Sequence, residues 1–149
     1  TLDFPEYPCE RVPLEDAVAA ATGERPVEVW QGKKLMAVYE HESQVRGITP
    51  DFERVAQLPA FGLIVTAPGD TCDFVSRYFV PTAGVPEDPV TGSAQCTAAP
   101  YWAGRLGRSH LTAHQVSSRG GRLTCDVMGE RVVLSGRMVS RTTAWLWLR

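Results

Sequence analysis

A string of acidic and small residues near the middle of the chain, Glu-Asp-Pro-Val-Thr-Gly-Ser-Ala at 87–94, has the composition of a binding site for an organic acid. Thr91 is a good helix N-cap, so Gly92, Ser93 and Ala94 would be the first helical residues. The N–H groups of a first turn have no partner within the helix, and the helix dipole favours negative charge there. We therefore expect a substrate carboxylate at Gly92, Ser93 and Ala94, with the hydroxyls of Thr91 and Ser93 as further donors.

Asp88 lies immediately before this predicted anion pocket. Pro89 restricts Asp88 to an extended backbone, which fixes the direction of its side chain. A carboxylate held beside a bound acid can move a proton on a neighbouring carbon, so Asp88 is a candidate catalytic residue. Glu87 is expected to point the opposite way, because side chains alternate along an extended chain. The same string is also typical of a plain loop and helix cap, in which Asp88 does no chemistry.

Composition narrows the class of protein. The chain has 149 residues, 44% of them hydrophobic, and a formal net charge of -2. This length suits a single domain with a real core, and the charge gives no reason to expect binding to nucleic acid or to an anionic membrane. No run approaches the roughly 20 apolar residues of a membrane span. The start, Thr-Leu-Asp-Phe-Pro, has no secretory pattern, so we expect a cytoplasmic protein.

The four cysteines, Cys9, Cys72, Cys96 and Cys125, are dispersed and have neither CxxC nor zinc-like spacing. Two disulfides are possible by count, but dispersed cysteines in apolar surroundings are typical of buried thiols in a reducing compartment. Cys96 would sit one turn into the predicted helix, where a buried thiol has a raised pKa and low reactivity. No metal site is predicted.

Local patterns predict an α+β fold. The predicted helices are 12–23, 49–60 and 91–106, and the predicted strands are 2–4, 61–69, 72–80, 111–118, 121–128, 131–139 and 142–149, with a hairpin at 26–40. The helix at 91–106 is small and apolar nearly all round, which is typical of a buried helix. We therefore expect mostly antiparallel strands wrapped around one central apolar helix.

The string from Gly84 to Val139, with Glu-Asp-Pro-Val-Thr-Gly-Ser-Ala, Ala-Pro-Tyr-Trp and Gln-Val-Ser-x-Arg-Gly-Gly in order, resembles the second half of the phenazine-biosynthesis PhzF-like isomerases. That family is similar in fold to diaminopimelate epimerase, with two lobes and an active site between them. The resemblance implies isomerisation by proton transfer without metal or organic cofactor. It also implies that Asp88 and Ser93 are catalytic residues, and that Gly92 and Ser93 supply backbone donors.

The same resemblance implies that 1–149 form a single C-terminal lobe of a larger fold, whose first lobe is absent from this chain. The family's principal acid/base glutamate and a glycine-histidine-alanine-threonine motif belong to that first lobe, and nothing here matches them. Gln95 stands where many members carry histidine. A first-lobe polypeptide or a second copy of the chain would then be a partner, and an apolar lobe face would favour a homo-oligomer.

Other residues carry weaker signals. Arg119, followed by Gly120 and Gly121, either reaches a substrate carboxylate or marks a strand turn. The three histidines are far apart and are expected at the surface or in packing contacts. Trp145 and Trp147 alternate with leucines in the last predicted strand, as core or lobe-interface residues do.

Two functions of different class follow. The first is isomerase-type proton transfer on a small carboxylic acid, with this chain supplying the second half of an inter-lobe active site. The alternative is a non-catalytic carboxylate-binding or assembly module that lacks the first-lobe acid/base residue. A truncated product with an exposed lobe face is a third interpretation, and the sequence does not identify the substrate.

Overall fold

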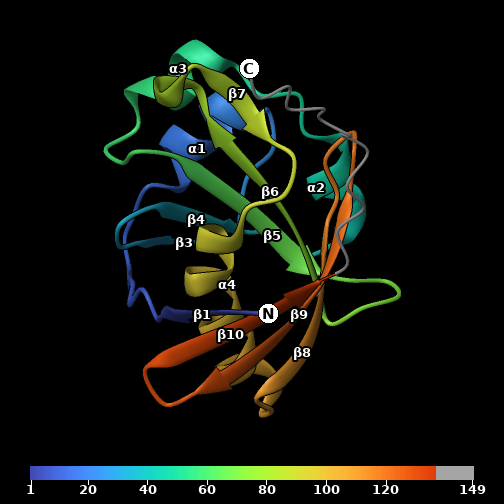
Figure 1. Cartoon of the computed structure of the whole chain (residues 1–149). Helices are drawn as coiled ribbons and strands as arrows, with labels where there is room; N and C mark the ends of the chain where they lie inside the picture. The colour runs from blue at the N-terminus through green and yellow to red at the C-terminus, as the bar shows by residue number, and fades with distance from the viewer. Residues whose placement is uncertain (137–149) are drawn as a thin grey trace, which may run out of the picture.

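The computed structural model describes residues 1–136 (Figure 1). Four α-helices are present in this range, α1 (Glu15–Thr22), α2 (Glu42–Gly47), α3 (Phe52–Gln57) and α4 (Gly92–Leu106), with a 3-10 turn at Pro81–Ala83. The strands are β1 (Leu2–Pro5), β2 (Glu10–Arg11), β3 (Glu28–Gln31), β4 (Leu35–Val38), β5 (Leu63–Pro68), β6 (Phe74–Val80), β7 (Val85–Asp88), β8 (His110–Gln115), β9 (Gly121–Met128) and β10 (Arg131–Gly136). No helix within 1–136 is long and apolar enough to cross a membrane.

The strands form one mixed sheet in the order β1-β10-β9-β8-β6-β5-β4-β3-β2, and β7 pairs with β6. Most neighbours are antiparallel, but β4 pairs with β5 and β6 with β8 in parallel. Mostly antiparallel strands were expected, and these two parallel pairs are the exceptions. Parallel neighbours need a long crossover, which α2 and α3 supply for the first pair and β7 and α4 for the second.

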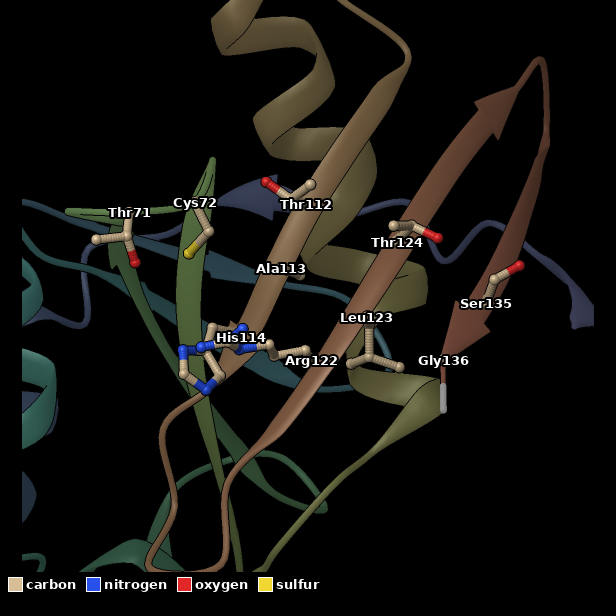
Figure 2. Close-up of a pocket in the computed structure, with 10 residues that line it drawn as sticks. All are labelled: Thr71, Cys72, Thr112, Ala113, His114, Arg122, Leu123, Thr124, Ser135 and Gly136. Atoms are coloured by element: carbon tan, nitrogen blue, oxygen red, sulfur yellow. The ribbon is translucent and has the colours of Figure 1, made fainter. Parts of the chain in front are cut away.

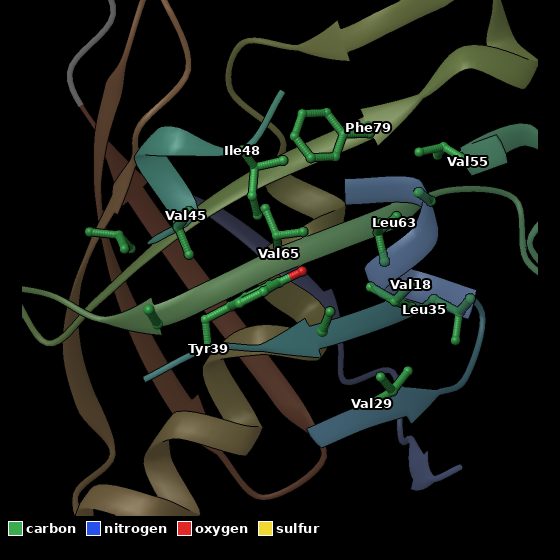
Figure 3. Packing of buried hydrophobic residues seen from close by; sticks show 14 of the residues in the cluster. Val18, Val29, Leu35, Tyr39, Val45, Ile48, Val55, Leu63, Val65 and Phe79 are labelled. Carbon is green, nitrogen blue, oxygen red and sulfur yellow. The ribbon is translucent and has the colours of Figure 1, made fainter. Parts of the chain in front are cut away.

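The central strands are buried on both faces, because each face has its own core. On one face, the core joins β4, β5 and β6 to α1, α2 and α3 (Figure 3). On the other, the same strands pack with α4, β8, β9 and β10. Strand β4 shows the division: Leu35 and Ala37 face the first core, and Met36 and Val38 face the second. A strand that is apolar at every position is the expected sequence pattern for such a place.

Helix α4 contributes small residues and one large aromatic residue to the second core. Ala94, Ala98 and Ala99 are almost fully buried, and the helix contacts β1, β5, β8, β9 and β10. The Trp102 ring stacks against Phe74 with a centroid separation of 6.0 Å, and its indole N–H donates to the Thr66 hydroxyl at 2.9 Å. Most of this helix is therefore buried, as predicted, because strands contact it on several sides.

Most predicted elements are present: the helices are shorter than predicted, whereas β9 has the predicted bounds and β1 is one residue longer. Asp51 caps α3 by accepting from the N–H groups of Glu53 and Arg54 at 3.1 Å, and Gly23 ends α1 with a φ of 76°. All four cysteines are free thiols. Helix α2 and the strands β2 and β7 were not predicted. The predicted strand at 142–149, with Trp145 and Trp147, lies outside the described residues.

Candidate functional site

A cleft of about 540 Å³ opens at the beginning of α4. Its lining comes from the β3–β4 turn, β6, β7, the loop before β5 and the first turn of α4. The residues are Lys34, Phe61, Tyr78, Val80, Ala83, Val85, Asp88, Pro89, Thr91 and Ser93. Asp88, Thr91 and Ser93, all predicted from sequence as site residues, thus share one cleft. Its wall is otherwise largely apolar, which suits the hydrocarbon part of a small organic acid.

Thr91 is the N-cap of α4, with extended backbone angles of φ -120° and ψ 106°, but its side chain does not cap the helix. Within 1–136, no protein group accepts a hydrogen bond from the N–H of Gly92 or Ser93. Ala94 is buried in the core and lines no part of the cleft, so a contact of Ala94 with a ligand stays a prediction. The first turn of α4 therefore offers unsatisfied donors beside Asp88.

The side chain of Gln115 holds the loop between Asp88 and Thr91 in place. Its amide N–H₂ donates to the carbonyl of Asp88 at 2.6 Å and to the Thr91 hydroxyl at 3.3 Å. Its amide oxygen accepts from the Thr91 N–H at 2.7 Å. Gln115 is fully buried on β8, so these bonds are shielded from water. This residue fixes the distance between the carboxylate and the helix start.

Gln115→Leu is expected to lower the free energy of unfolding by about 1–3 kcal/mol, because it leaves the Thr91 N–H and the Asp88 carbonyl buried without partners. Urea denaturation followed by circular dichroism measures the change. Gln115→Glu is the matched variant: it keeps an acceptor for the Thr91 N–H but removes the donor to the Asp88 carbonyl. Unchanged stability in Gln115→Leu would show that the loop does not depend on this amide.

Glu87 points away from the cleft, as the sequence predicted, and its partner is Arg77 on β6. The guanidinium donates to both carboxylate oxygens of Glu87, at 2.8 and 3.0 Å. It also donates to the carbonyls of Val45 and Ile48 at the end of α2, at 3.1 and 2.8 Å. This bidentate pair fixes β7 against β6, and strand alternation then turns Asp88 to the opposite side.

Arg119 is exposed in the turn between β8 and β9 and is not among the cleft residues. Gly120 in this turn has a φ of 71°, which matches the strand-turn interpretation of the Arg-Gly-Gly string. Gly121 lies against Val90: a Cβ on it would stand 2.4 Å from the Val90 side chain. Ser117 donates its hydroxyl to the Pro89 carbonyl at 2.8 Å. The described contacts of this turn thus support the site loop, and a contact of Arg119 with substrate stays a prediction.

Two polar residues of the cleft, Lys34 and Tyr78, were not predicted from sequence as site residues. Lys34 is 8% exposed, although it follows the β3–β4 turn where an exposed lysine is the usual expectation. Burial lowers the pKa of its ammonium group. Tyr78 is 4% exposed, and burial together with the nearby Asp88 carboxylate raises its pKa to about 12, so its hydroxyl stays protonated at neutral pH. A weak signal for Tyr78 was its place on the same side of β6 as Phe74.

Gln95 is fully buried in α4. Its amide N–H₂ donates to the Ser76 hydroxyl at 3.2 Å. The residue therefore ties α4 to β6 and does not line the cleft.

A larger cavity of about 860 Å³ lies elsewhere, between the β5–β6 loop and the strands β8, β9 and β10 (Figure 2). Cys72, His114 and Arg122 are among its lining residues, and Figure 2 shows the last two side by side. Burial and the adjacent Arg122 lower the pKa of His114, which keeps the imidazole neutral near pH 7. None of the residues predicted as site residues lines this cavity.

The fold is α+β, with a large mixed sheet, few helices and a cleft at the N-terminus of the longest helix. Residues 3–144 match the family described as phenazine biosynthesis-like protein. The chain belongs to this PhzC-PhzF family, as its sequence motifs predicted.

Relatives agree with this assignment in sequence and in fold. An uncharacterized isomerase of Pseudomonas aeruginosa is 51% identical over 93% of the chain and 53% of its own length. A PhzF-family crystal structure from Enterococcus faecalis superposes with a TM-score of 0.88 at 46% identity, covering 91% of this chain and 52% of that one. A Clostridium difficile structure titled as a putative PhzC/PhzF protein gives 0.90 at 34% identity, covering 99% and 57%. The chain spans about half the length of these relatives.

Proposed function

We propose that this chain takes part in an isomerisation by proton transfer on a small carboxylic acid, and that it supplies one half of the active site. The observation that carries the proposal is the common cleft of Asp88, Thr91 and Ser93, with the unsatisfied N–H groups of α4 beside the carboxylate. The acid group of the substrate would bind at these N–H groups. Relatives named as isomerases support the reaction class.

The proposed isomerisation changes no oxidation state, so it needs neither an oxidant nor a reductant. Asp88 exchanges a proton with one carbon of an allylic system, while a second acid/base group exchanges a proton with the carbon two positions away. The double bond moves between them, and the product is an isomer of the substrate. The carboxylate bound at α4 fixes the reacting carbons relative to Asp88. No metal or organic cofactor takes part in this proposed sequence.

The second acid/base group would come from a polypeptide outside this chain. The relatives are about twice as long as the region matched here, so a complementary half exists in them. In the proposal, 1–149 form one lobe with α4 as its central helix, and the site is completed at the contact with a first-lobe polypeptide or a second copy of the chain. The contacts of α4 with β1, β5, β8, β9 and β10 support this role.

The test measures solvent deuterium entering an unsaturated acid. The chain is expressed alone and together with the part of the 51%-identical Pseudomonas relative that lies outside the match. Cyclohex-1-enecarboxylate and but-2-enoate are incubated in D₂O, and deuterium at the α and γ carbons is followed by mass spectrometry. We expect exchange with the complementing polypeptide and little without it. Absence of exchange in both samples would contradict the proposed reaction for these acids.

A carboxylate-binding or assembly module is the competing function, and the same samples separate the two. The unsatisfied N–H groups at the start of α4 would bind a carboxylate whether or not a reaction follows, and this observation supports the module. Calorimetry is carried out on the sample that contains the complementing polypeptide. Binding of an acid that exchanges no deuterium in this sample would identify the chain as a binding module.

A further inference from the structure

The ammonium group of Lys34 lies at the beginning of α4 without an acidic partner. Its nearest hydrogen-bonding neighbour is the carbonyl oxygen of Ser93 at 3.5 Å. The ammonium group also contacts two aromatic rings: the ring centroids of Tyr7 and Tyr78 lie 5.4 and 5.5 Å from Nζ. Among the described residues, no carboxylate forms an ion pair with Lys34, although nine other ion pairs are present in that range.

This position is electrostatically unfavourable for the ligand-free protein. A buried charge is normally paired, because removal from water costs several kcal/mol that only an opposite charge or strong hydrogen bonds offset. Cation–π contacts offset only part of such a cost. The positive end of the α4 dipole adds repulsion at the same place. Two sources of positive potential thus converge on the cleft, and Asp88 is not in ion-pair contact with the ammonium.

A second, independent group points to the same ligand. The Tyr78 hydroxyl is buried, and it has no hydrogen-bond partner among the residues that the structure describes. The Tyr78 side chain lines the cleft together with Lys34 and Ser93. A buried hydroxyl without a partner is unfavourable, and a hydrogen bond to a ligand oxygen in the cleft would remove this penalty.

We propose that Lys34 is a substrate-binding residue whose ammonium group pairs with the carboxylate of the acid held at the first turn of α4, with the Tyr78 hydroxyl as an additional donor. This inference rests on the acid-binding part of the proposed function and assigns the counter-ion that the site requires. It makes a charged carboxylate, as opposed to a neutral amide or ester, the determinant of binding. Lys34 and the α4 amides then form one anion site on two segments distant in sequence.

The test compares sodium benzoate with benzamide, which has the same ring but no charge, by calorimetric titration of the whole chain at constant ionic strength. Lys34→Met is expected to weaken benzoate binding about ten-fold or more and to leave benzamide binding unchanged, since one charge-assisted contact contributes at least about 1.4 kcal/mol. Lys33→Met is the matched control, because Lys33 is the exposed neighbour and lies outside the cleft lining. It should keep the native preference for benzoate.

Thermal unfolding without ligand separates a binding role from a structural one. Removal of an unpaired buried charge should leave the melting temperature of Lys34→Met unchanged or raise it by about 2–4 °C. Tyr78→Phe should also keep its stability while benzoate binding weakens, because the hydroxyl has no partner to lose within 1–136. A lower melting temperature in Lys34→Met with unchanged benzoate affinity would overturn the proposal and make Lys34 structural.

Failure of this inference is distinguishable from failure of the isomerase proposal. If the chain binds benzoate in a way that depends on Lys34 but no unsaturated acid exchanges deuterium, the anion site is supported and the proposed reaction is contradicted. If deuterium exchange occurs but benzoate and benzamide bind with equal affinity, the proposed reaction is supported and the proposed role of Lys34 is contradicted. A native chain that binds neither compound overturns the anion site itself.

Discussion

Asp88→Asn should reduce solvent deuterium incorporation about 10²–10⁴-fold in the complemented chain, because the amide cannot take up and return a proton as a carboxylate does. The substitution keeps the size of the side chain. The bonds from Gln115 go to the Asp88 carbonyl and to Thr91, not to the Asp88 carboxylate, so the loop should keep its geometry. Benzoate binding should therefore persist while exchange is lost.

Asp70→Asn is the matched control for this experiment, because Asp70 is exposed and lies outside the cleft. It should exchange deuterium at the native rate. Native exchange in Asp88→Asn as well would remove this residue from the reaction. Loss of both binding and exchange would mean that the carboxylate is needed for the structure of the cleft, and the proposed proton transfer would lose its support.

Glu87→Ala is expected to lower the free energy of unfolding by about 3 kcal/mol, because it leaves the guanidinium of Arg77 without its carboxylate. The side chains of Arg77 and Glu87 are only 12% and 21% exposed, so solvent compensates little for the loss. Strand β7 pairs with β6 alone in the described sheet, and its register is expected to loosen. Asp88, the next residue, would lose its fixed direction, and deuterium exchange should fall together with stability.

Asp3→Ala provides the comparison. The ion pair of Asp3 with Arg131 has an N–O distance of 2.9 Å, close to the 2.8 Å of the Arg77–Glu87 pair, but its side chains are 58% and 50% exposed. Exposed pairs contribute about 0–1 kcal/mol. Equal losses in the two variants, measured by urea denaturation, would mean that Arg77 finds other partners and that β7 does not depend on Glu87.

Elements with strong local signals were predictable from sequence. Thr91 and Gly107 bound α4 at the two ends, Asp51 caps α3, and Gly23 closes α1 with a left-handed backbone. In each case one residue type satisfies a local geometric requirement, so no knowledge of distant contacts is needed. The cleft residues Asp88, Thr91 and Ser93 lie within six positions of one another, which is why their proximity was predictable as well.

Features that depend on distant contacts were not predictable. Helix α2 has six residues, and its N-cap is His41, which is not a favoured cap residue, although Gln44 completes a capping box there. Strand β7 contains Pro86, which indicates a loop or an edge strand. Lys34 follows a hairpin turn, and its burial depends on α4, far along the chain. A usable signal existed for Gln115: it follows Leu111 and Ala113 on the inward side of β8, where a polar residue needs a partner.

The pairing of β1 with β10 has a consequence for biosynthesis. Leu2 lies opposite Leu134 and Phe4 opposite Val132, so the first strand of the sheet acquires its neighbour only after some 130 further residues have been made. Such long-range pairing raises contact order and slows folding. While β10 is still inside the ribosome, Val132 and Leu134 cannot yet cover the apolar side of α4. We therefore expect chaperones to bind the exposed apolar surface of the nascent polypeptide.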